Sequence, residues 1–211
     1  MTIKNTKEYL SNIRFYVLVF SGVLSVVEYW WVTSFVEKPL QNLALTQTYA
    51  LTAATYLYFA ILAGPLSFTF KWIPFRWHYI KARRAIGVST FYFALLHAYR
   101  GFYGEIGGFS GVVNQPVFYI IAITLSSIAL FILFLMAATS FDYMVSKLTF
   151  PLWKKLHRFV YIASIFVLIH ALLIGSHFRD LKGPIPIIAF IAILFLLLLE
   201  FLRITAFLKK Q

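Results

Sequence analysis

Two histidines in strongly apolar segments are the residues whose type and placement could support chemistry. His97 lies in the segment FALLHAYR and His170 in FVLIHALL. An ionisable side chain inside an apolar helix is costly to bury, so each is a candidate functional residue. Neutral imidazole is also the most common metal ligand in proteins. The two histidines are therefore candidate metal ligands, the alternative being a hydrogen bond to a neighbouring helix.

Both histidines are expected at the same depth. His97 lies 13 residues after Arg84, about 20 Å along a helix, and His170 lies 15 residues after Lys155, about 22 Å. The two helices are expected to run in the same direction, so the imidazoles reach a similar level. Two facing imidazoles are what a six-coordinate haem iron requires, and a haem offers apolar surface to the side chains around it. The pattern predicts one haem b with His97 and His170 as axial ligands.

Arg100 follows His97 by three residues, on the same helix face and one turn nearer the outer surface. Its guanidinium suits the carboxylate of a haem propionate. It could equally extend to the lipid headgroups, and the sequence leaves both interpretations open. His78 and His177 lie outside the apolar interior, where a solvated position is expected.

His157 is a third candidate, 13 residues before His170 and about 20 Å nearer the inner surface. A second haem would fit that depth. However, an ideal helix places the two side chains roughly 140° apart, and Arg83 and Arg84 occupy the matching level of the third helix. His157 could therefore line an inner pocket for a second haem, a flavin such as FMN, or a quinone, with Arg83, Arg84 and Lys155 binding anionic groups. An interfacial histidine is the simpler alternative.

The composition indicates that these residues are positioned by helices in a membrane. Of 211 residues, 61% are hydrophobic and 12% are charged, too few polar residues to cover a soluble protein. Several apolar runs reach the roughly 20 residues that a helix needs to cross a bilayer, and the alternating pattern of a barrel is absent. There is no cysteine, so disulfides, Fe–S clusters and thiolate chemistry are excluded.

Six spans are expected, at residues 14–35, 47–70, 84–103, 116–139, 153–178 and 184–207. The net charge of +12 is distributed beside these spans, which argues for a membrane lipid partner and against nucleic acid. Four basic residues fall on one side: Lys38, Arg100, Arg179 and Lys182. The other fifteen, Lys4, Lys7, Lys210 and twelve between them, fall on the opposite side. This bias predicts an all-α bundle in the inner (plasma) membrane, one domain over 1–211, with both termini cytoplasmic.

Several short motifs together resemble a known family. They are ARRAIG at 82–87 with Leu96-His97, then TS at 139–140, WKKLHRFVY at 153–161, and Ile169-His170. This combination resembles the ferric reductase-like transmembrane domain family, and within it the MsrQ (YedZ) type of haem-binding membrane subunit. The similarity is strongest over 47–178. The oxidases of the wider family carry four haem-ligating histidines, whereas the third helix here has one, which favours a flavin at the inner site.

The resemblance implies a b-type cytochrome that carries electrons from a cytoplasmic flavin reductase or quinol to an external acceptor. In the MsrQ type that acceptor is a periplasmic molybdopterin reductase subunit that repairs oxidised methionine. By this resemblance His97 and His170 are the haem ligands and His157 contributes to an inner cofactor site. The chain has no G-x-G-x-x-G motif after a strand, so we expect electrons from a partner. The chain would then be an electron-transfer subunit of an oxidoreductase system.

Other functions remain as alternatives. A stand-alone ferric or quinone reductase would use the same haem. Gly108-Phe109-Ser110-Gly111 matches the GxSG of intramembrane serine proteases, but we expect it in a loop. Glu28 and Glu200 could suggest a transporter, although Arg203 three residues after Glu200 favours a helix-terminal ion pair.

Overall fold

The computed structural model describes residues 12–181 and 183–209, and within these residues the regular structure is entirely helical. The long helices are α2 (Ile13–Phe35), α3 (Gln41–Thr69), α4 (Arg76–Arg100), α6 (Val117–Ala138), α9 (Val160–Ile174) and α10 (Pro184–Leu208). The shorter ones are η1 (Lys38–Leu40), η2 (Gly101–Glu105), α5 (Gly108–Val113), α7 (Asp142–Leu148) and α8 (Phe150–His157). The expected all-α fold is therefore confirmed for the described chain.

Five helical stretches of the described chain are long and apolar enough to cross a membrane. They are Ile13–Phe35, Lys38–Thr69, Val117–Ala138, Phe150–Ile174 and Pro184–Leu208. The chain is thus a multi-pass membrane protein. α4 is not among these stretches, because the charged residues Arg76, Lys81, Arg83 and Arg84 lie in its first half. The total of six spans depends on α4 and stays a prediction, as does the cytoplasmic position of both termini; Lys4, Lys7, Lys182 and Lys210 lie outside the described residues.

Two helices begin earlier than the apolar pattern indicates. α3 begins at Gln41 and α4 at Arg76, whereas the spans were expected from 47 and 84. Polar residues at a helix end can extend the hydrogen-bonded helix into the interface, so hydrophobicity marks the membrane-crossing part and not the full helix.

The expected fifth span is divided into two helices. A turn at Arg158 and Phe159 separates α8 from α9, and α9 ends at Ile174, before the expected 178. Upstream, Thr149 has a φ of 62°, which is unusual for a β-branched residue and separates α7 from α8. The break lies between His157 and His170, so the two histidines do not belong to one straight helix.

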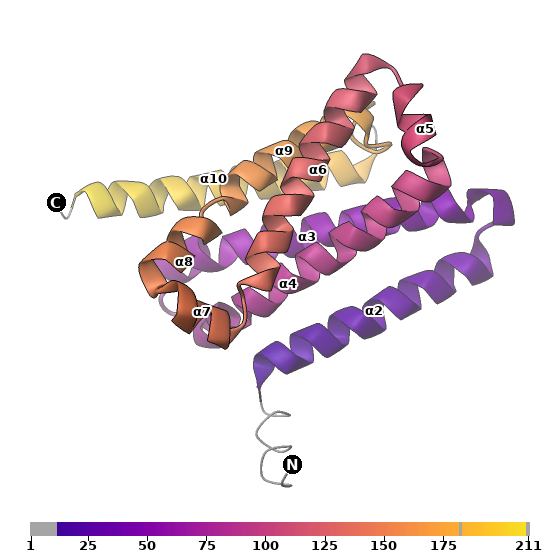
Figure 1. Cartoon of the computed structure of the whole chain (residues 1–211). Helices are drawn as coiled ribbons and strands as arrows, with labels where there is room; N and C mark the ends of the chain where they lie inside the picture. The colour runs from indigo at the N-terminus through magenta and orange to yellow at the C-terminus, as the bar shows by residue number, and fades with distance from the viewer. Residues whose placement is uncertain (1–11, 182, 210–211) are drawn as a thin grey trace, which may run out of the picture.

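α3 is the central helix of the bundle, with α2 and α4 on one side and α10 on the other (Figure 1). It contributes to two buried clusters. One contains Val32, Leu45, Tyr49, Ala53 and Phe93, from α2, α3 and α4; the other contains Leu57, Ile61, Leu133 and Val160, from α3, α6 and α9. α3 thus packs against helices of both clusters, and α6, which contacts both α4 and α9, links the two helices that carry His97 and His170.

Hydroxyl groups attach α2 to the rest of the bundle. Ser21 Oγ lies 2.7 Å from Ser89 Oγ of α4 and 2.9 Å from Tyr56 OH of α3, and Ser25 Oγ lies 2.8 Å from Tyr92 OH. In a bilayer, moving an apolar side chain from contact with lipid to contact with another helix contributes little hydrophobic free energy. Interhelical hydrogen bonds of this kind therefore contribute to the placement of α2.

Candidate functional site

The structure brings together the rings of His97, on α4, and His170, on α9; we call this pair the paired-histidine site. The ring centroids are 5.9 Å apart and the ring planes are nearly perpendicular, at 83°. Two imidazoles bound to opposite sides of one metal ion, with metal–nitrogen bonds of about 2 Å, would have their centroids roughly 6 Å apart. The observed separation is therefore suited to a metal ion shared by the two rings.

Each imidazole of the pair hydrogen-bonds a backbone carbonyl through Nδ1. His97 Nδ1 lies 2.9 Å from the Thr46 carbonyl oxygen of α3, and His170 Nδ1 lies 3.1 Å from the Ala122 carbonyl oxygen of α6. A carbonyl only accepts, so each Nδ1 carries a proton and donates, which leaves a lone pair on each Nε2. Metal-binding histidines are commonly oriented by a hydrogen bond of this kind. In a neutral ring this hydrogen bond leaves Nε2 available to bind a metal.

Small residues bring the backbone of α6 within reach of His170. Ala122 of α6 and Ala163 of α9 are both 0% exposed. Small residues at a helix interface allow two membrane helices to approach closely. A close approach of α9 to α6 is what lets the imidazole of His170 reach the Ala122 carbonyl.

The donor set restricts what the pair could bind. Within residues 12–181 and 183–209, His, Cys, Asp and Glu side chains form no group of three or more that could hold a metal ion. Two imidazoles leave a bare ion short of ligands, since even zinc takes four. A metal bound here must bring further ligands of its own, as the iron of a porphyrin does.

Arg100 packs against α2. Its guanidinium carbon lies 5.7 Å from the ring centroid of Tyr29. In the described part of the chain, its charge has no carboxylate partner. η2 follows directly, and there the Asn42 amide of α3 hydrogen-bonds both the Arg100 carbonyl and the Glu105 carboxylate. These contacts join the ends of α3 and α4 one turn beyond His97.

His157 lies at the opposite end of the bundle from the pair, among basic residues; we call His157, Arg83, Arg84 and Asp142 the basic end. The His157 ring stacks on Trp153, with centroids 4.1 Å apart and planes tilted by 32°. Its Nε2 lies 3.3 Å from the Thr139 hydroxyl, while the Trp153 indole donates to the Thr139 carbonyl at 3.0 Å. His157 is therefore held against the end of α6.

The two arginines of the basic end have different surroundings. Arg84, expected to be available to an anionic cofactor, already pairs with Asp142 at 2.7 Å and donates to the Ser140 carbonyl. Arg83 donates through Nε to the Ala60 carbonyl of α3 at 2.8 Å. Arg84 thus has a protein partner, whereas the two terminal amino groups of Arg83 have no hydrogen-bond partner within residues 12–181 and 183–209.

Asp142 is bound by two arginines. Besides Arg84, it contacts Arg14 of α2 at 3.2 Å. Slight burial acts to raise the pKa of the Asp142 carboxyl, but hydrogen bonding and charge from Arg84, then from Arg14, outweigh it and hold that pKa below its ordinary value. This ion-pair group connects α2, α4 and α7.

Comparison with known proteins shows the family of the chain. Residues 48–168, more than half of it, match the family described as ferric reductase like transmembrane component. The chain belongs to this family. It is also 34% identical over 123 residues to the protein-methionine-sulfoxide reductase heme-binding subunit MsrQ of Pectobacterium atrosepticum, covering 58% of this chain and 59% of that relative. No solved structure matches the chain.

The segment that matches the ferric reductase family contains most of the site. His97, His157 and Arg83 fall inside it, and His170 lies two residues beyond its end at 168. α4 and α9, which supply the two paired rings, both lie largely within the match. The paired-histidine site is therefore built on α4, which lies wholly within the family segment, and on α9, which lies partly within it.

The residues of the alternative functions have other surroundings. Ser110 is exposed on the short helix α5, and its hydroxyl donates to the Gly107 carbonyl, so the structure does not pair it with a histidine base. Glu200 forms the expected ion pair with Arg203 at 2.7 Å. Glu28 accepts a hydrogen bond from Thr52 at 2.6 Å. Neither the protease nor the transporter interpretation gains support from these contacts.

Several groups of the site carry no signal in the sequence. The Thr46 and Ala122 carbonyls are backbone atoms, so no residue type marks them. Asp142 lies in a short loop helix and is brought to Arg84 only by folding. Trp153 was visible in the motif WKKLHRFVY, since four residues separate it from His157 on one helix face, and this spacing could have predicted the stacked pair.

Proposed function

We propose that this protein is a b-type haem cytochrome of the membrane that carries electrons from a cytoplasmic donor to an external acceptor. The observation that carries the proposal is the separation of 5.9 Å between the rings of His97 and His170, with both Nδ1 atoms on backbone carbonyls. The Pectobacterium relative is named as a heme-binding subunit, and this similarity supports the same cofactor here. A ligand pair without a third protein donor is suited to an iron that a macrocycle already coordinates.

The chain's own residues hold and tune the site. His97 and His170 would bind the iron through Nε2, and the Thr46 and Ala122 carbonyls keep both imidazoles neutral and oriented. A bound haem supplies one-electron chemistry, and its potential is set by the axial ligands, burial and nearby charge. Arg100, one turn beyond His97, would bind a propionate. α4 would complete the six spans of a single domain, and the basic loops would lie in the cytoplasm.

The basic end would receive electrons from the donor. His157 with its Trp153 stack, Arg83 and Lys155 would border an inner site for FMN or another flavin, for a quinone, or for a second haem. A flavin phosphate is anionic, so the free amino groups of Arg83 suit it. Because His157 Nε2 already lies beside the Thr139 hydroxyl, and Arg83 and Arg84 stand on α4, a flavin or quinone fits this end better than a second iron. The donor would be a cytoplasmic flavin reductase or membrane quinol.

The acceptor would be a periplasmic methionine sulfoxide reductase containing molybdopterin, which makes this chain the membrane subunit of a two-component system in the inner membrane. The name of the Pectobacterium relative supports this partner. The family description favours a second candidate, a stand-alone ferric reductase. Reconstituted protein that reduces external ferric chelates, but not the reductase subunit, would select the second candidate.

The haem assignment is tested with purified variants. His97→Ala and His170→Ala should each lose the low-spin, six-coordinate absorption spectrum and most of the haem measured as pyridine haemochrome. His78→Ala is the matched control, because His78 is exposed on the first turns of α4 and should keep both signals. Elution at the wild-type volume in size exclusion shows that a variant is folded. A folded His97→Ala or His170→Ala variant with a normal six-coordinate spectrum would contradict the assignment.

A further inference from the structure

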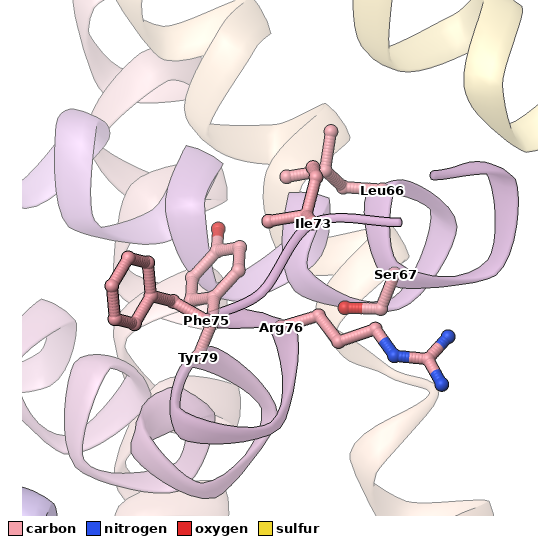
Figure 2. A pocket seen from close by; sticks show the side chains of 6 residues that line it. All are labelled: Leu66, Ser67, Ile73, Phe75, Arg76 and Tyr79. Carbon is pink, nitrogen blue, oxygen red and sulfur yellow. The ribbon is translucent and has the colours of Figure 1, made fainter. Parts of the chain in front are cut away.

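Two cavities adjoin along one face of α3, away from the paired-histidine site. The smaller, of about 150 Å³, lies where α3 turns into α4 and is lined by Leu66, Ser67, Ile73, Phe75, Arg76 and Tyr79 (Figure 2). The larger, of about 440 Å³, lies between α2, α3 and α4; Thr55 and Phe59 are among its lining residues. Tyr79 lines both cavities, so both border its side chain.

The α3 residues that line the two cavities follow one helix face. They are Thr52, Thr55, Tyr56, Phe59, Leu66 and Ser67. These positions are mostly separated by three or four residues, or by two turns, which keeps them on one side of a helix. From first to last the face is about 22 Å long, compared with about 15 Å for half of the hydrocarbon core of a bilayer. A single acyl chain could lie along it.

The smaller cavity has a polar group without a partner. Ser67 is 8% exposed, and its Oγ has no hydrogen-bond partner among the described residues. A buried hydroxyl without a partner is destabilising, so a ligand that accepts its hydrogen bond would be favoured. Arg76 lines the same cavity, and in Figure 2 its stem passes the Ser67 hydroxyl and its guanidinium lies beyond it. Guanidinium and hydroxyl donors together suit a phosphate.

The surrounding turn has the character of a membrane interface. Between residues 70 and 81 lie Lys71, Arg76, Lys81 and His78, with no acidic residue. Trp72, Phe75 and Trp77 are strongly exposed there, at 79%, 72% and 60%. Exposed tryptophan with basic residues is typical of the headgroup level, and the positive charge favours a net anionic lipid.

We propose that this face of α3 binds one anionic phospholipid. Its phosphate lies between Ser67 and Arg76, and one acyl chain passes Tyr79 into the larger cavity between α2 and α3. The hydroxyl of Tyr79 already donates to the Phe59 carbonyl, so the ring separates the polar and apolar parts of the site. A quinone fits less well, because its neutral ring has no charge for Arg76 to bind. The lipid would fill the space beside α2, which hydroxyl contacts hold to the bundle.

The charged part of the site is tested with Arg76→Gln and its control Lys71→Gln, which removes the same charge from the same turn but does not line the cavity. Native mass spectrometry of the detergent-purified full chain measures bound phosphatidylglycerol, and phosphatidylcholine serves as the neutral comparison. Wild type and Lys71→Gln should retain phosphatidylglycerol, whereas Arg76→Gln should bind it about fivefold more weakly. Equal binding by both variants, or no preference for phosphatidylglycerol, would overturn the proposal.

The acyl-chain part is tested by filling the larger cavity. Thr55 lines that cavity and is exposed, so Thr55→Trp should displace the lipid without disturbing the core. Ala54→Trp places the same side chain on the neighbouring exposed position, which does not line the cavity, and should keep the lipid. Lipid retained by Thr55→Trp contradicts the proposal, and so does a quinone that is present in solvent extracts of Ala54→Trp but missing from those of Thr55→Trp. A matching melting temperature for the two variants shows that folding is unchanged.

Discussion

The paired-histidine site and the basic end place the same residue type in different surroundings. His97 and His170 each donate from Nδ1 to a backbone carbonyl, and their ring centroids lie 5.9 Å apart. His157 has an indole against its ring and a hydroxyl 3.3 Å from its Nε2. Nε2, the nitrogen proposed to bind iron, has no hydrogen-bond partner in the pair among the described residues, whereas at the basic end it lies beside the Thr139 hydroxyl. The role of a buried histidine follows from the contact of its second nitrogen as much as from its depth.

The largest effect expected from this difference is on haem retention. His170→Gly should lose the six-coordinate spectrum, because one side of the iron has no protein ligand, and added imidazole should restore it by occupying the space of the missing ring. His157→Gly should keep the spectrum with or without imidazole. Absorption spectra of both proteins before and after imidazole addition measure this. Loss of all haem from His157→Gly would show that the basic end also binds iron.

The next effect concerns the rate of electron entry. His157→Ala should slow reduction of the haem by the cytoplasmic donor by about 10–100-fold, the usual scale for loss of a group that orients a cofactor. Stopped-flow absorption with the physiological reductase or a quinol analogue measures this rate. Dithionite, which needs no inner site, is the control and should reduce the variant at the wild-type rate. If the physiological donor reduced the variant as fast as it reduces the wild type, His157 would not take part in electron entry.

A smaller effect is expected at the α6–α9 contact that orients His170. Ala122→Leu adds bulk where the residue is 0% exposed, and overpacking of this kind costs about 1–3 kcal/mol. It should lower the melting temperature and the haem content together, because α9 must move away from α6. Ala138→Leu, at an exposed position of the same helix, is the control. Normal haem content in Ala122→Leu would show that this carbonyl contact is dispensable.

The smallest effect concerns the Asp142 ion pairs. Because the pKa of Asp142 is lowered in the folded protein, its carboxylate stabilises the fold above the ordinary aspartate pKa of about 3.9, and this stabilisation is lost as pH falls through the lower, folded value. Asp142 is largely exposed, so Asp142→Asn should cost less than about 1 kcal/mol near neutral pH. Melting temperatures of variant and wild type should converge in acid. A difference that persists below about pH 3 would contradict the ion-pair origin.

From the sequence we predicted that His97 and His170 lie at the same depth in the membrane, but not which groups their side chains contact. Apolar segments and helix rise were enough to place both imidazoles at one level. The carbonyls of Thr46 and Ala122 could not be predicted, because every residue has a carbonyl and only helix packing selects one. At the basic end, Arg84 could be predicted as a cation but its pairing with Asp142 could not, since 58 residues separate them.

The sequence alone determined that the chain is helical, apolar and multi-pass, because hydrogen bonding in lipid permits few backbone arrangements and long apolar runs select the helix. It also determined which side chains are costly enough in the membrane to require a function. Only the tertiary structure decided that the rings of His97 on α4 and His170 on α9 lie side by side, and that the fifth span breaks after His157. Rotation and bending of a helix depend on its packing against neighbours such as α3 and α6, and that packing is a property of the whole bundle.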